Sequence, residues 1–127
     1  MLSRFLLISI GAALGANARY FVGLWASDRL GVGFPFGTTI VNVTGALMLG
    51  FILELTTDRF ITSPEAKLFI ATGFLGSYTT FSTYMVESIT LMRQGNMLMG
   101  VVNIAGEAIL GLLFAVLGMV LARVVGL

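Results

Sequence analysis

The chain has 127 residues, of which 57% are hydrophobic and only 10% are charged, a balance outside that of soluble globular domains. Seven Lys and Arg residues against six Asp and Glu residues give a formal net charge of +1, so there is no basic field for nucleic acid. Because Cys and His are absent from the sequence, disulfides, thiolate chemistry and the usual zinc or haem ligands are excluded. The composition indicates an integral membrane protein.

The first apolar segment, residues 5–24, is long enough to cross the hydrocarbon core of a bilayer, which takes about 20 residues. Small residues at positions 16–18 imitate the cleavage site of a secretory signal. The chain that follows is just as apolar, however, so we expect a retained transmembrane helix over about residues 4–25. A connection punctuated by Gly and Pro should follow, up to residue 36.

Three further helices are predicted, over about residues 37–56, 65–93 and 97–124. The third should begin at an N-cap, because Ser63 is followed by Pro64 at the first helical position. Its centre is crowded with Gly and hydroxyl residues, which compete with regular helical bonding, and we expect a break at residues 76–80. The sequence thus predicts an all-α integral membrane protein, a single four-helix domain over residues 1–127 with a broken third helix.

A broken helix in a membrane has two interpretations. Irregular backbone at membrane depth persists only where protein or a water-filled cavity satisfies its amide groups, which favours a buried site. The alternative is an ordinary kink stabilised by Ser and Thr side chains. The high density of hydroxyl residues in this segment favours the site.

Basic residues are distributed almost evenly between the two sides of the membrane. With four helices, both termini share one side with the loop between helices two and three. Four basic residues fall on that side and three on the other: Arg4, Arg59, Lys67 and Arg123 against Arg19, Arg29 and Arg93. Orientation normally follows a clear excess of Lys and Arg, so we expect insertion in both orientations and an antiparallel dimer, unless another feature fixes the orientation.

Polar and aromatic side chains within the spans are candidates for a pathway. Thr38 and Asn42 share one face of the second helix, and the amide of Asn42 is the strongest single candidate. Its alternative role is a structural bond between helices. Phe81 and Tyr84 form an aromatic face after the break, and ring edges can replace water around a small anion without a trapping full charge.

Two acidic residues lie more than one turn inside the ends of the predicted spans, Glu87 on the third helix and Glu107 on the fourth. Intramembrane acids are functional by default. A protonated or hydrogen-bonded Glu at a helix interface is the structural alternative, and an ionised Glu would oppose the passage of an anion. The residues alone do not decide the role of Glu107.

Three motifs together resemble a known family: GAALG at 11–15, followed by Arg19 and Tyr20; GTTIVN at 37–42, followed by Gly45; and GFLGSYTTFST at 73–83. This pattern resembles the small fluoride channels called Fluc or CrcB, over essentially the whole chain. The resemblance implies an antiparallel, dual-topology homodimer with two pores. It further implies passive export of fluoride across the bacterial inner membrane, which relieves fluoride toxicity.

The resemblance also assigns roles to individual residues. It places Asn42, Phe81, Ser82, Thr83 and Thr39 in the fluoride pore, with Tyr84 at the position of a second Phe, where it keeps the ring and adds a hydroxyl. Arg19 would attract anions in a vestibule, although interfacial snorkelling is an alternative. A structural Na⁺ at the dimer centre would be held by the main-chain carbonyls of Gly76 and Thr79. Glu107 departs from the family, which has a small polar residue there; it could bind the ion when protonated or mark a heterodimer subunit with one altered pore.

Other classes fit less well. A small multidrug-type, proton-coupled exporter of cations would need an acid in the first helix, and residues 5–24 contain none. A holin-like assembly protein would explain the helices but not Asn42 beside an aromatic break. An enzyme is not expected, because no nucleophile pairs with His and there is no cluster of metal ligands.

Overall fold

The computed structural model describes residues 1–57 and 63–126, and every element in them is helical. The elements are α1 (Leu2–Leu30), α2 (Phe36–Thr57), α3 (Pro64–Lys67), the π-helical segment η1 (Leu68–Leu75), α4 (Gly76–Tyr78), α5 (Phe81–Arg93) and α6 (Met97–Val125). Arg59, which entered the count of basic residues, lies outside the described residues.

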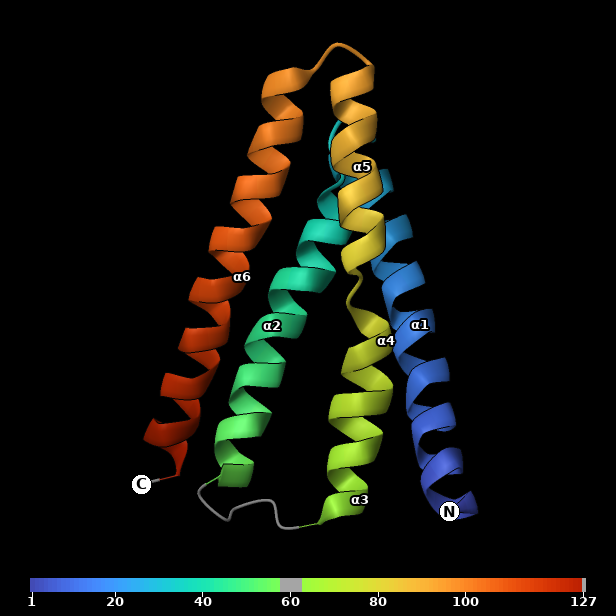
Figure 1. Cartoon of the computed structure of the whole chain (residues 1–127), viewed down its shortest axis with the longest axis vertical. Helices are drawn as coiled ribbons and strands as arrows, with labels where there is room; N and C mark the ends of the chain where they lie inside the picture. Colours follow the sequence, from blue (N-terminus) through green and yellow to red (C-terminus); the bar gives the residue numbers. More distant parts are fainter. Residues whose placement is uncertain (58–62, 127) are drawn as a thin grey trace.

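Three of the described helices are long and apolar enough to cross a membrane: Leu2–Leu30, Phe36–Thr56 and Met97–Val125. The segments α3, η1, α4 and α5 follow one another along a fourth, interrupted passage (Figure 1). Successive passages run in opposite directions, so both chain ends lie at the same end of the molecule (Figure 1). The chain is therefore a multi-pass membrane protein.

The first helix is longer than the sequence indicated. We expected it to end near residue 25, but α1 continues to Leu30 and the following connection is correspondingly short. The polar residues after Trp25 oppose burial in lipid, yet they do not oppose helical backbone. The helix ends at Gly31, whose φ of 84° ends the α-helical backbone and whose amide donates to Ser27 O at 3.1 Å.

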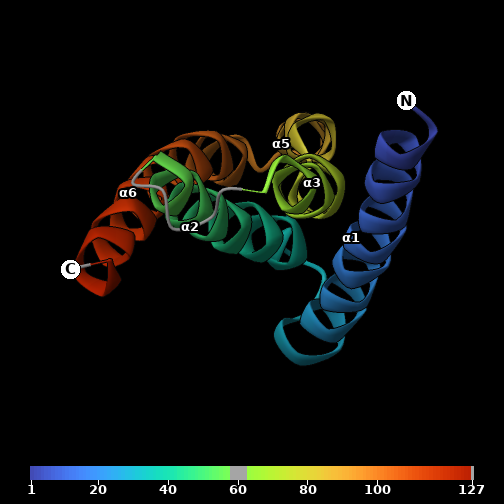
Figure 2. The same cartoon turned by 90° about the horizontal axis from the view of Figure 1, so that it is seen from below.

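Backbones approach closely where glycines face a neighbouring helix. A Cβ at Gly15 of α1 would collide with the carbonyl oxygen of Phe74 in η1, and one at Gly118 of α6 would collide with that of Leu47 in α2. Small residues are the usual means of close helix packing in membranes. Seen from below, α1 and α6 lie on opposite sides of α2 and of the broken passage (Figure 2).

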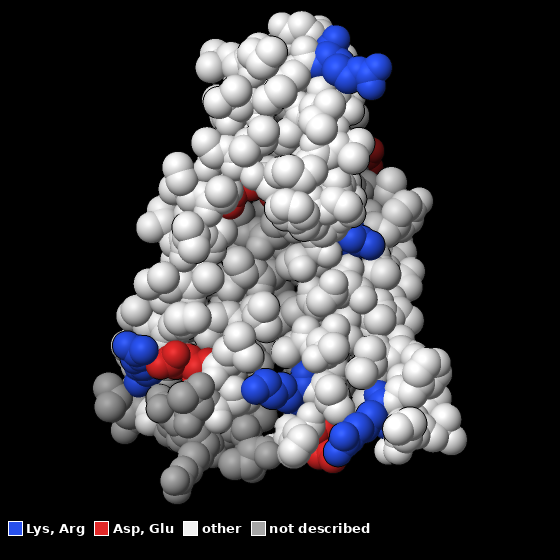
Figure 3. All heavy atoms as spheres, viewed as in Figure 1, with Lys and Arg blue, Asp and Glu red and all other residues white. Residues whose placement is uncertain are grey.

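The interior is small and the outer surface is apolar. Val41, Leu75 and Tyr78 form a buried cluster, whereas many large apolar side chains of α1 and α6 are exposed, as expected for helices in lipid. Most charged atoms on the face shown in Figure 3 lie at its lower end, with one basic group at the top and a few charged atoms between. At one end, Arg123 Nε of α6 donates to Glu54 Oε1 of α2 at 2.6 Å.

Candidate functional site

The third passage is interrupted at Thr79 and Thr80. Thr79 has φ −85° and ψ 160°, and Thr80 has φ −153° and ψ 109°, so both residues are extended. This break lies within the segment in which the sequence predicted one. Thr80 also caps the next helix, because its Oγ1 accepts from Thr83 N at 3.3 Å.

Asn42 of α2 satisfies the main chain at the break. Thr80 N donates to Asn42 Oδ1 at 2.7 Å, and Asn42 Nδ2 donates to Thr80 O at 3.1 Å. The side-chain amide thus pairs with both polar main-chain groups of Thr80, much as a neighbouring strand would. This pairing explains how an extended backbone persists at membrane depth.

The break also releases main-chain carbonyls from helical bonding, among them those of Gly76 and Thr79. In a regular α-helix, Gly76 O would accept from Thr80 N, and Thr79 O would accept from Thr83 N. Here Thr80 N donates to Asn42, and Thr83 N donates to the Thr80 hydroxyl. Thr79 O instead receives Arg19 Nη1 of α1 at 3.4 Å.

Glu107 of α6 also contacts Asn42. The residue is only 7% exposed. Its Oε2 accepts from Asn42 Nδ2 at 2.7 Å, and its Oε1 accepts from Thr39 Oγ1 at 3.1 Å. Glu107 is therefore bonded to two of the residues that were assigned to an anion pathway.

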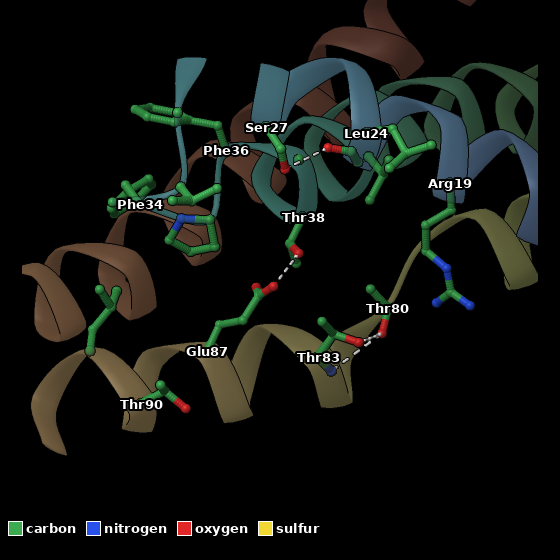
Figure 4. A pocket seen from close by; sticks show the side chains of 18 of the residues that line it. Arg19, Leu24, Ser27, Phe34, Phe36, Thr38, Thr80, Thr83, Glu87 and Thr90 are labelled. Carbon is green, nitrogen blue, oxygen red and sulfur yellow. Dashed lines mark hydrogen bonds between the residues drawn. The ribbon is translucent and has the colours of Figure 1, made fainter. Parts of the chain in front are cut away.

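A cavity of roughly 820 Å³ lies between α1, α2 and α5, and Arg19, Thr38, Thr80, Thr83 and Glu87 are among the residues that line it. In Figure 4, Glu87 points from α5 across to Thr38 of α2, while Arg19 enters from α1 near Thr80. Thr38 Oγ1 donates to Glu87 Oε1 at 2.9 Å, whereas Glu87 Oε2 is buried without a hydrogen-bond partner in the described part of the chain.

A second cavity of roughly 470 Å³ lies on the other side of the break. Its lining includes Asn42, Gly76, Thr79, Thr80, Phe81, Tyr84 and Glu107. Thr80 lines both cavities, so its contact with Asn42 lies at the boundary between them. A polar junction of α2, α5 and α6 thus separates two spaces within the membrane-spanning part of the protein.

The two aromatic residues after the break differ in their surroundings. Phe81 is 74% exposed, whereas Tyr84 is buried and its hydroxyl donates to Ile104 O of α6 at 2.6 Å. Their rings meet edge to face, with centroids 5.9 Å apart. The hydroxyl that distinguishes Tyr84 from Phe therefore ties α5 to α6, while its ring lines the second cavity.

The structure gathers some of the predicted site residues and separates others. Asn42, Thr39 and Glu107 meet directly, whereas Arg19 and Thr83 line the first cavity and Ser82 lines neither cavity. The sequence did not predict that Thr80 pairs with Asn42. The position of Thr80 at the end of the expected break, three residues before Thr83, was the available signal.

Comparison with known proteins gives the family. The family model described as "CrcB-like protein, Camphor Resistance (CrcB)" matches residues 6–119. The chain belongs to the CrcB family. Relatives named "Fluoride-specific ion channel FluC" include one from Trichormus variabilis, 43% identical over 94% of this chain and 88% of the relative. Another from Clostridium perfringens is 43% identical over 94% and 93%, and one from Chloroflexus aurantiacus is 41% identical over 96% and 97%. CrcB membership confirms the resemblance read from the three motifs.

Proposed function

We propose that this chain is a subunit of a passive fluoride channel of the bacterial inner membrane, which relieves fluoride toxicity and catalyses no reaction. The observation that carries the proposal is the Asn42 amide, held at a helix break between two cavities and near the exposed ring of Phe81. The identity of the ion is inferred from family membership, because the relatives above are named fluoride-specific channels.

The lining suits a small anion that sheds water. Amide and hydroxyl hydrogens of Asn42 and Thr39 and the ring edges of Phe81 and Tyr84 offer positive partial charge without a full cation, so an ion can enter and still leave. Ser82 and Thr83 would extend this polar track. Arg19, at the edge of the larger cavity, would raise the local concentration of anions.

A second copy of the chain is part of the proposal. Gly76, Phe81, Ser82 and Thr83 are exposed in the single chain, although they belong to the proposed pathway. In an antiparallel homodimer about a two-fold axis in the membrane plane, each subunit would cover these residues of the other, and two pores would form. The near-even distribution of Lys and Arg along the sequence supports insertion in both orientations. A heterodimer is the alternative.

A structural Na⁺ at the dimer centre is proposed from the released carbonyls. Gly76 O and Thr79 O have lost their helical amide partners, and hard cations such as Na⁺ prefer oxygen ligands. Two copies would supply these two carbonyls each. We expect the purified dimer to be more heat-stable in sodium than in potassium or N-methylglucamine; equal stability in all three salts would count against the ion.

The test of the channel is ion release from liposomes loaded with fluoride or chloride, followed with an ion-selective electrode. We expect fast release of fluoride, none of chloride, and loss of release in Phe81→Ile. Phe5→Ile is the matched control, because Phe5 is similarly exposed, at 66%, but lies on α1 away from both cavities. Silence toward both ions at every pH tested would overturn the proposal and favour proton-coupled cation export through Glu87 or Glu107.

A further inference from the structure

The hydrogen-bond donors that an anion would need are already bonded to a side chain of the protein. Asn42 Nδ2 carries two hydrogens: one goes to Thr80 O and the other to Glu107 Oε2. The Thr39 hydroxyl faces the second carboxyl oxygen of Glu107. With Glu107 in this position, Asn42 has no amide hydrogen left for an ion.

We propose that the Glu107 carboxylate is a built-in competitor for the anion site at Asn42, and that an anion occupies this site only when Glu107 carries a proton. The inference rests on the proposed channel function. An ionised carboxylate is itself an anion, and its attachment to α6 gives it a high effective concentration at the donors. It also repels a second negative charge, so fluoride cannot simply join it there.

The hydrogen-bond network accommodates both protonation states. Thr39 Oγ1 lies 3.1 Å from Glu107 Oε1 and 3.2 Å from Pro35 O, yet a hydroxyl has a single hydrogen to donate. When Glu107 is ionised, Thr39 donates to it. When Glu107 is protonated, Thr39 donates to Pro35 O and accepts the carboxyl proton. The bond from Asn42 is then no longer charge-assisted, so an anion can displace the neutral acid.

The groups around Glu107 identify the one other acid that could produce the same pH dependence. From α5, Glu87 and Tyr84 are close enough to interact electrostatically with Glu107. α2 presents uncharged Thr39 and Asn42, and no Lys or Arg of the described chain forms an ion pair with Glu107. On the α1 side, the nearest basic residue to the break is Arg19, which binds Thr79 O. Glu87 must therefore be tested separately.

The experiment measures fluoride release from liposomes across a series from mildly acid to mildly alkaline pH. Release from protein-free liposomes is subtracted, because undissociated HF leaks faster as the pH falls. We expect wild-type release to rise as the pH falls. Glu107→Gln, neutral and of the same shape, should release about tenfold to a hundredfold more than wild type at alkaline pH, the worth of one hydrogen bond to a charged group. It should also lose the pH dependence.

Two further variants separate the alternatives. Glu107→Ala should likewise release fluoride independently of pH, which shows that the Gln amide is not itself responsible, and Glu87→Gln should keep the pH dependence. Size-exclusion chromatography and thermal melts establish that each variant is folded.

Each contrary outcome has a distinct meaning. If wild type and Glu107→Gln release fluoride equally at every pH, and Phe81→Ile abolishes release, the inference about Glu107 is overturned while the channel stands. If the dependence disappears in Glu87→Gln and persists in Glu107→Gln, the competitor is not Glu107. Silence from all variants at all pH values would overturn both the inference and the channel.

Discussion

Asn42→Ala is expected to destabilise the protein because one side chain holds the helix break together. The substitution removes the bond from Thr80 N, the bond to Thr80 O and the bond to Glu107. Hydrogen bonds between membrane helices contribute about 0.6 kcal/mol on average and up to about 1.7. Three of them sum to about 2 kcal/mol, and the buried amide of Thr80, left without a partner, adds about 1–3.

The free energy of unfolding should therefore fall by about 2–5 kcal/mol in Asn42→Ala. The lower end of this range applies if the Thr80 amide bonds to Gly76 O instead and the passage becomes a continuous helix. The measurement is reversible unfolding in mixed detergent and SDS, followed by circular dichroism. Asn17→Ala is the matched control, because Asn17 is exposed on α1 and its side chain, within the described part of the chain, bonds only to Ala13 O of its own helix. This variant should change stability by less than about 0.5 kcal/mol. Equal stabilities of the two variants would refute the reasoning.

Two other substitutions test the packing around the site. Gly15→Ala places a methyl group against the carbonyl of Phe74 and should cost about 1–3 kcal/mol in the same unfolding assay, whereas Gly23→Ala, with open space around it, should be neutral; comparable losses would show that α1 tolerates the contact. Tyr84→Phe deletes the bond to Ile104 O but keeps the ring, so it should lose about 1 kcal/mol of stability and retain fluoride release; loss of release with unchanged stability would mean that the hydroxyl acts on the ion instead.

Local features of the fold were predictable because their signals are local. Ser63 was expected as an N-cap from its place before Pro64, and its Oγ accepts from Ala66 N. The break was expected because Gly and hydroxyl residues crowd the middle of an apolar segment. The predicted end of α1 was wrong, because hydropathy indicates where a segment leaves the membrane and not where its helical backbone ends.

Most residues of the site were predictable, but the hydrogen bonds between them were not. Asn42 and Thr80 are separated by 38 positions, and Asn42 and Glu107 by 65. No periodicity in the sequence links residues on different helices. The sequence therefore showed that each residue is polar and lies within a span, but not which of them are in contact. The bond between Glu107 and Asn42, on which the pH inference rests, follows only from the way α6 packs on α2.

The pairing of Asn42 with Thr80 has a consequence for biogenesis. Because Thr80 of the third passage relies on a side chain of α2 for both of its main-chain partners, it lacks these partners while that passage is alone in lipid. A newly inserted third passage is therefore most stable as one uninterrupted helix, and it opens only when it docks against α2. The break is a product of helix association and not of membrane insertion. The carbonyls that it releases lose their helical hydrogen bonds in the same step.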